Sequence, residues 1–120
     1  MAEKPVVTSE IAVTLKVIGG KWKPLILECL RQEGAKRYSE LQRYLGSAPK
    51  KTLTAQLREL EEDGVISRTV LPAAPPQVLY ALTPRGESLN PVLDAMCDWG
   101  YEHRAGYILA HPTCSEEDGA

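Results

Sequence analysis

The chain has 120 residues, a net charge of −2 and a hydrophobic fraction of 43%, which is ordinary for one globular domain. No apolar run approaches the roughly 20 residues that a membrane helix requires. The N-terminal Met-Ala-Glu-Lys-Pro also lacks the apolar stretch of a signal peptide. These features argue against a membrane protein, and we expect a cytoplasmic one.

The charge is distributed unevenly along the chain. Between Lys16 and Arg58 there are ten basic residues and three acidic ones, so this stretch carries +7 and the remainder carries −9. A polyanion such as double-stranded DNA would be attracted by one part of the chain and repelled by the other, which would orient it on the protein.

The first predicted element is a helix that begins near Thr8, after a disordered lead over residues 1–7. Ile11, Leu15 and Ile18 fall on one stripe, and Gly19-Gly20 ends the helix. The other side also carries valines. A short helix that is apolar on two sides is typical of a contact between two bodies, so we expect a subunit interface here.

Two further helices precede the most informative one. The second spans Trp22 to Gln32, with Pro24 tolerated in its first turn and Gly34 at its end. A short third helix has Ser39 near its start and Gly46 at its end. The tight connection 47–49 follows, and we expect Pro49 in the first turn of the next helix.

A longer amphipathic helix runs from Lys50 to Asp63, with Leu53, Leu57 and Leu60 forming its buried stripe. Its first turns are basic and its last turn is acidic, which is the reverse of what the helix dipole favours. Bare N–H groups, lysines and threonines at a helix N-terminus suit an external anion such as a DNA phosphate. The plainer alternative is a solvated helix with randomly placed charge.

A short helix, a turn containing Gly and a longer helix with a basic N-terminus make a helix-turn-helix, whose second helix enters the DNA major groove. Side chains of this helix can reach phosphates or base edges, and the preceding helix can add charge. The residues that we expect to contact DNA on this basis are Lys36, Arg37, Lys50, Lys51, Thr52, Thr54, Ala55, Gln56 and Arg58.

After Gly64 the period of the sequence changes to that of strands. Residues 65–71 are rich in β-branched side chains, 72–76 form a Pro-rich loop, and 77–82 alternate. The predicted fold is therefore mainly α with a small antiparallel β-hairpin, which is a winged helix-turn-helix.

The C-terminal part begins with Thr83-Pro84, an N-cap followed by Pro at the first helical position. Pro91 must kink this helix or start it again. Leu93, Met96 and Trp99 lie along one side and suit either the core or a two-fold dimer seam. We expect a further turn over 107–110. The winged-helix domain would thus span 8–110, with an acidic tail over 111–120.

Three cysteines are present, an odd number without a Cys-x-x-Cys pair, and we expect free thiols. Cys29 lies in an apolar helix and suits the core, Cys97 lies in the last helix, and Cys114 is expected to be exposed in the tail. Cys97 or Cys114 could serve as a thiol sensor. We expect no metal site and no cofactor, and we expect no enzymatic activity because no nucleophile–base pair stands out.

These motifs together resemble the HxlR-type regulators, bacterial relatives of the MarR-type winged-helix repressors. The resemblance covers roughly residues 9–103. The matching pieces are Ile18-Gly19-Gly20-Lys21-Trp22, Arg37-Tyr38-Ser39-Glu40-Leu41, Leu57-Arg58-Glu59-Leu60-Glu61-Glu62-Asp63-Gly64, Pro75-Pro76, Leu82-Thr83 and Trp99-Gly100.

The resemblance implies a homodimer that binds inverted-repeat operator DNA and responds to a redox signal or to a small-molecule effector of unknown identity. It also implies dimer contacts from the first and last helices. The candidate dimerisation residues are Ile11, Leu15, Ile18, Leu93, Met96 and Trp99.

Three positions depart from the family pattern. Ser9 stands where such proteins usually carry a cysteine, which argues against thiol sensing at the N-terminus. Pro49 replaces a frequent serine cap, so the phosphate contact must come from Ser47 or from bare N–H groups. Gln77 replaces a common arginine of the wing, and a neutral wing adds less phosphate affinity.

One alternative function stays open from the sequence alone. A winged helix can serve as a protein-interaction module without specific DNA binding, and the acidic end of the 50–63 helix could meet a basic partner protein.

Overall fold

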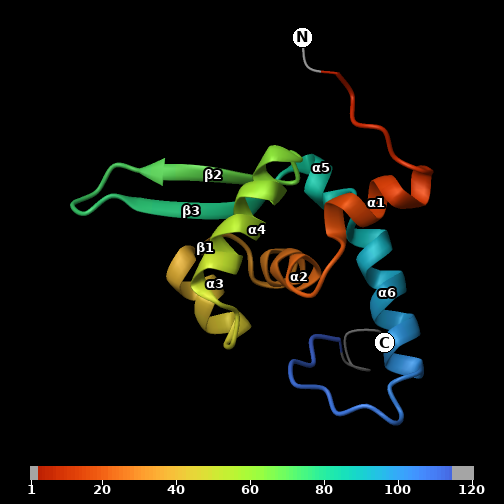
Figure 1. Ribbon diagram of the computed structural model, residues 1–120. Coiled ribbons are helices and arrows are strands. Elements are labelled where there is room, and N and C mark those ends of the chain that lie inside the picture. The colour runs from red at the N-terminus through yellow and green to blue at the C-terminus, as the bar shows by residue number, and fades with distance from the viewer. Residues whose placement is uncertain (1–2, 115–120) are drawn as a thin grey trace.

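The computed structural model describes residues 3–114 and shows a winged helix-turn-helix (Figure 1). No helix among these residues is long and apolar enough to cross a membrane. The elements in chain order are α1 (Glu10–Ile18), α2 (Lys23–Glu33), β1 (Lys36–Arg37), α3 (Tyr38–Leu45), α4 (Lys50–Glu62), β2 (Ile66–Leu71), β3 (Gln77–Leu82), α5 (Pro84–Glu87) and α6 (Asn90–Glu102).

The core lies where α2, α3 and α4 meet. The predicted stripe of Leu53, Leu57 and Leu60 is buried, as is Cys29 on α2, which confirms both predictions. Burial of a leucine side chain contributes about 1.5–3 kcal/mol, so this stripe fixes which face of α4 turns inward. The opposite face is left to solvent.

Helix ends follow the local signals of the sequence. Ser9 caps α1 by accepting from the Ala12 N–H, and Thr83 caps α5 by accepting from the Gly86 N–H. Pro91 lies in the first turn of α6, so it starts a new helix after α5, as one of the two predicted outcomes required. Gly46 ends α3 with φ 69°, a value that favours glycine, and so makes the turn into α4 possible.

The sheet has three antiparallel strands in the order β1-β3-β2. Strands β2 and β3 pair from Ile66↔Leu82 to Leu71↔Gln77, which confirms the predicted hairpin, and its tip projects away from the helices (Figure 1). The prediction missed β1, where Lys36 pairs with Tyr80. Two residues are too short for alternation to show, and their strand geometry comes from the partner strand.

The segment after α6 reverses and lies below α2 and α6 (Figure 1). The predicted turn over 107–110 is wrong, since no helical turn forms there. The reversal brings the Cα atoms of Cys97 and Cys114 to 5.7 Å, and the two cysteines form a disulfide, so the prediction of free thiols is wrong for this pair. Cys29 is free.

The first residues of the predicted tail contact the folded body. The His111 ring hydrogen-bonds the Tyr44 carbonyl, and the Gln32 side chain donates to the Thr113 carbonyl at 3.2 Å. These contacts follow from the chain reversal, which carries no periodic signal in the sequence. The acidic run 116–118 lies outside the described residues.

Candidate nucleic-acid interface

The N-terminus of α4 is open to an external anion. Pro49 is its N-cap, one position before the predicted first turn, and no side chain caps the helix. Ser47 is exposed and does not supply the cap. The first N–H groups of α4 therefore lack a side-chain acceptor, and the helix dipole adds positive potential at the same point.

Exposed cations without acidic partners gather on α3 and α4. Among residues 3–114, no carboxylate lies within ion-pair distance of Lys50, Lys51, Arg58 or Arg43. An unpaired cation can bind a phosphate without first breaking an internal ion pair. The three residues on α4 were predicted to contact DNA; Arg43 was not.

Two of the four acids at the C-terminal end of α4 are engaged within the protein, whereas Glu61 and Glu62 are exposed and make no ion pair among the described residues. Lys23 Nζ, on a lysine only 5% exposed, lies 2.8 Å from Glu59 Oε1, and Lys16 Nζ lies 3.4 Å from Asp63 Oδ1. These ion pairs attach the C-terminal half of α4 to α1 and α2. They give a structural reason for the reversed charge order of the helix, because acids at this end meet lysines that come from other elements.

The polar side chains of α4 are not equally available. Thr54 Oγ1 donates to the Lys50 carbonyl at 2.9 Å, and the Tyr38 hydroxyl lies 3.3 Å from Thr54 Oγ1. The Thr54 hydroxyl can therefore accept a hydrogen bond but has its proton engaged. Ala55 is exposed, whereas Thr52 and Gln56 are half-buried beside it.

Two predicted DNA contacts already have acidic neighbours. Lys36 Nζ lies 3.2 Å from Glu33 Oε1, and Arg37 Nε lies 3.5 Å from Glu40 Oε1. The Arg37 backbone N–H also donates to Glu40 and holds the pKa of that carboxyl below its ordinary value. Arg37 thus helps to cap α3, and these two cations are less free than those of α4.

A cleft between α4 and the sheet holds a further cation that the sequence analysis did not select. Arg58 lines this cleft together with Arg68 of β2, which pairs with Tyr80 across the hairpin. Arg68 is exposed and makes no ion pair among the described residues. The sequence signal that could have identified Arg68 is its position as a basic residue within a predicted strand of the wing. Gln77 lies exposed at the start of β3.

The candidate dimerisation residues divide into two groups. Ile11, Leu15, Met96 and Trp99 are exposed, with Ile11 at 74% and Trp99 at 67%. Ile18 and Leu93 are each 4% exposed and pack in the core of the chain itself, so they are not available as interface residues. One end of the apolar stripe of α1 therefore packs in the core of the same chain while the rest is exposed, and the spacing of the apolar residues alone does not reveal this.

A helix-turn-helix with an open, cationic second helix and an adjoining β wing defines the class of winged helix-turn-helix DNA-binding proteins. A profile described as HxlR-like helix-turn-helix matches residues 17–106, and the chain belongs to this family.

Named relatives agree with this assignment. The chain is 50% identical over 101 residues to YtcD of Bacillus subtilis (strain 168), described as an uncharacterized HTH-type transcriptional regulator; the match covers 84% of this chain and 79% of the relative. A crystal structure of ytcD is similar with a TM-score of 0.77 at 49% identity, covering 81% of this chain and 98% of that one. The oxidized form of the redox regulator HypR gives 0.75 at 42% identity, covering 80% and 98%. The protein is a transcriptional regulator of the helix-turn-helix type.

Proposed function

We propose that the protein binds inverted-repeat operator DNA as a homodimer, with α4 of each protomer in the major groove. The observation that carries this proposal is the division of charge along α4. Its N-terminal half presents Lys50 and Lys51 without acidic partners, and two of the four acids at its C-terminal end, Glu59 and Asp63, are tied to Lys23 and Lys16. The protein-interaction alternative needs that acidic end for a basic partner, and among the described residues only Glu61 and Glu62 of it are exposed without an ion pair.

Each part of the interface has a role that its chemistry favours. Lys50, Lys51 and Arg58 supply phosphate affinity, and the open N-terminus of α4 adds N–H donors. Gln56 and Thr52 supply hydrogen bonds to base edges, while Ala55 can contact a thymine methyl group. Thr54 acts as an acceptor, since its proton is engaged by the Lys50 carbonyl.

The wing extends the same surface toward the neighbouring backbone. Arg68 stands in the cleft beside Arg58 and supplies a cation on the wing, where Gln77 is neutral. We therefore expect Arg68 to provide part of the phosphate affinity that an arginine at position 77 would give. Lys36, Arg37 and Ser47 belong to the same side of the proposed interface and contribute less, because the two cations are shared with Glu33 and Glu40.

The dimer would be formed through the exposed apolar side chains of α1 and α6. Ile11, Leu15, Met96 and Trp99 leave large apolar surfaces in water, and burial against a second copy removes that cost at about 25 cal/mol per Å². A two-fold axis would place the two α4 helices about one DNA turn, roughly 34 Å, apart.

A chemical or redox signal would act by changing the angle between the protomers, and with it the spacing of the two recognition helices. HypR, a similar structure, is described as a redox regulator. Ser9 replaces the N-terminal cysteine that is usual in the family, so any thiol chemistry of this chain must lie elsewhere.

Selection of bound duplexes from a random DNA pool at about 0.15 M salt tests the proposal. We expect enrichment of an inverted repeat whose half-site centres are about 10 base pairs apart. Recovery of no enriched sequence, with binding that disappears as salt is added, would contradict it and favour the protein-interaction alternative.

A further inference from the structure

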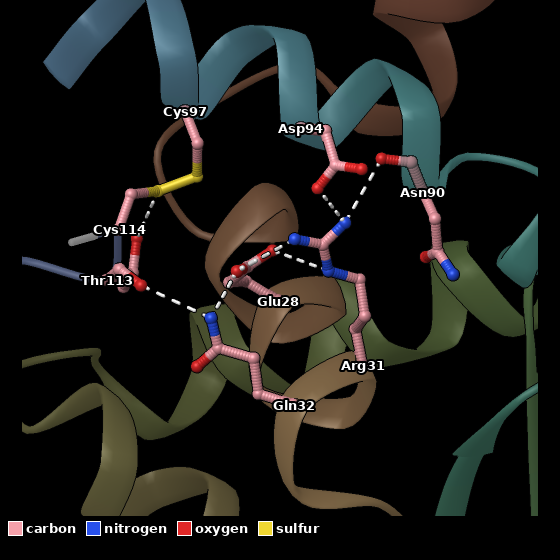
Figure 2. The surroundings of a disulfide bond; sticks show 8 residues. All are labelled: Glu28, Arg31, Gln32, Asn90, Asp94, Cys97, Thr113 and Cys114. Carbon is pink, nitrogen blue, oxygen red and sulfur yellow. Dashed lines mark hydrogen bonds and ion pairs between the residues drawn. A yellow bond between two sulfur atoms is a disulfide. The ribbon is translucent and has the colours of Figure 1, made fainter. Parts of the chain in front are cut away.

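Three potential metal ligands meet at the lower end of α6. One sulfur each of Cys97 and Cys114 and one carboxylate oxygen of Glu28 all lie within 4.8 Å of one another. Figure 2 shows the cysteines joined as a disulfide, with the Glu28 carboxylate beneath α6 on the neighbouring helix α2. The ligands come from three separate parts of the chain, so their convergence is a property of the fold.

Glu28 is the least expected member of this group, because it is an acidic residue that is only 3% exposed. A buried carboxylate is costly unless its oxygens have partners. Oε2 accepts from the Gln32 amide and from Arg31 Nη2 at 3.4 Å. Oε1 accepts no hydrogen bond of acceptable geometry, although Arg31 Nε lies 3.2 Å away. One buried oxygen therefore keeps capacity for another ligand.

Neighbouring side chains already hold the carboxylate in position. Gln32 donates both to Glu28 and to the Thr113 carbonyl, which joins α2 to the segment that carries Cys114 (Figure 2). Arg31 is shared between Glu28 and Asp94 Oδ1, the latter at 2.6 Å. Such outer partners orient metal-ligating carboxylates in known sites.

The local charge also suits a divalent cation once the disulfide is reduced. Glu28, Asp94 and Arg31 together carry −1, and two thiolates would bring the group to −3. A cation of charge +2 restores −1, which is the value that the disulfide form has. Without a cation, two half-buried thiolates beside a carboxylate would repel one another, and an ion of charge +2 between them removes that repulsion.

We propose that the reduced Cys97 and Cys114, together with Glu28, bind one thiophilic divalent cation, with Zn²⁺ as the best match. Reduction by a dithiol breaks the S–S bond, leaving two cysteine thiols and converting the dithiol to its own disulfide. Binding of Zn²⁺ then forms two Zn–S bonds and one Zn–O bond and releases two protons. The site is separate from the DNA interface, so it stands or falls independently of the proposed function.

The geometry required is close to the geometry present. Zn–S bonds of about 2.3 Å at tetrahedral angles place the two sulfurs about 3.8 Å apart, and the Cα separation of 5.7 Å allows this with small side-chain rotations. Three protein ligands leave a fourth position for water. A cavity of about 270 Å³ lined by all three ligands gives a water and an ion access.

The metal and the disulfide would be alternative ways to hold the same segment. Both attach residues 111–114 to α6, and the metal would attach them to α2 as well. Oxidation by a hydroperoxide would form the S–S bond from the two metal-bound thiolates, take up two protons from water, convert the hydroperoxide to an alcohol and water, and release the ion.

Titration of the full reduced chain with Co²⁺, a spectroscopic substitute for Zn²⁺, tests the site. We expect one Co²⁺ per chain, thiolate-to-cobalt charge-transfer absorption in the near ultraviolet, visible bands of tetrahedral Co²⁺, and displacement by Zn²⁺. The oxidised chain should show none of these. Zinc-free reduced protein without charge-transfer absorption at saturating Co²⁺ would overturn the proposal.

Single variants distinguish the loss of a metal ligand from a loss of folding. Cys114 lies outside every helix and strand, so the Cys114→Ser variant should fold normally and lose the spectrum of two thiolate ligands. Glu28→Gln should keep the sulfur absorption and weaken Co²⁺ binding by about 10-fold or more. Cys29→Ala removes the one cysteine outside the group and should bind normally, with far-ultraviolet circular dichroism confirming the fold of each variant. A spectrum that survives Cys114→Ser, or an affinity unchanged by Glu28→Gln, would refute the three-ligand site.

Discussion

Replacing Lys51 by Ala tests the placement of α4 on DNA. Lys51 is exposed near the N-terminus of α4, points away from the buried leucine stripe and makes no ion pair among the described residues. Its loss should therefore leave the fold intact and remove one phosphate contact per protomer. Because a phosphate contact carries no base information, we expect binding to weaken on all sequences alike.

The size of the effect follows from counterion release. Each phosphate contact contributes a slope of about −0.9 in log affinity against log salt, so two lost contacts in a dimer make the slope shallower by about 1.8. Between about 0.05 and 0.2 M salt, the wild-type protein should then lose about 12-fold more affinity than the variant. If the variant and the wild type bind equally at about 1 M salt, the same slopes give the variant an affinity on the order of 30-fold lower at about 0.15 M salt, or about 2 kcal/mol.

Fluorescence anisotropy of a labelled operator duplex over a salt series measures both quantities. Lys21→Ala is the matched control, because it removes the same charge at a position away from the N-terminus of α4. Lys21 lies over the Trp22 ring, and its neighbours Lys16 and Lys23 form ion pairs with the opposite, C-terminal half of α4. We expect this control to keep the wild-type slope. Equal slopes for Lys51→Ala and the wild type would refute the placement of the α4 N-terminus on the DNA backbone.

Four further predictions follow from the described contacts. Gln56→Ala should relax preference at one position per half-site, losing about 1–3 kcal/mol of discrimination in repeated duplex selection. Glu59→Ala leaves the buried Lys23 ammonium without its carboxylate and should lower the free energy of unfolding by about 1–3 kcal/mol in urea. Trp99→Ala should weaken the dimer by about 2 kcal/mol in sedimentation equilibrium. Burial raises the pKa of Cys29 from 9.0 to about 11; the unfolded chain therefore loses this proton first as pH rises, and stability should fall between about pH 9 and 11 by roughly 2–3 kcal/mol.

Each of these predictions has an outcome that contradicts it. An unchanged selected motif would place Gln56 away from the bases, and unchanged urea stability would mean that the Lys23 pair adds nothing. An unchanged dimer dissociation constant would remove Trp99 from the interface. The fall in stability at high pH should be absent from Cys29→Ala, and its persistence there would assign it to another group.

Local signals predicted most of the fold. The leucine stripe of α4, the break at Pro91 and the hairpin around Pro75-Pro76 depend on periodicity and on backbone chemistry within a few residues. Each is confirmed by the structure. The cationic half of α4 was visible for the same reason, since it is contiguous in sequence.

Features that depend on distant parts of the chain were not predictable. The Lys16–Asp63 and Lys23–Glu59 ion pairs join residues 47 and 36 positions apart. The Cys97–Cys114 disulfide depends on the path of residues 103–113, which form no regular element. The burial of Ile18 was also hidden, because a helix with apolar residues on two sides does not specify which side its own core covers.

The role of α4 as the recognition helix is tested most directly by locating α4 on a selected operator. In Ala55→Cys the new thiol is exposed, whereas Cys29 is fully buried and the other two cysteines are disulfide-bonded, so an iron chelate can be attached at position 55 under non-reducing conditions. If α4 is the recognition helix, cleavage will fall inside both half-sites, centred on two major-groove segments about 34 Å apart on one face of the duplex. Cleavage confined to the flanks, or no stronger than that by an untethered chelate, would contradict the claim that α4 is the recognition helix.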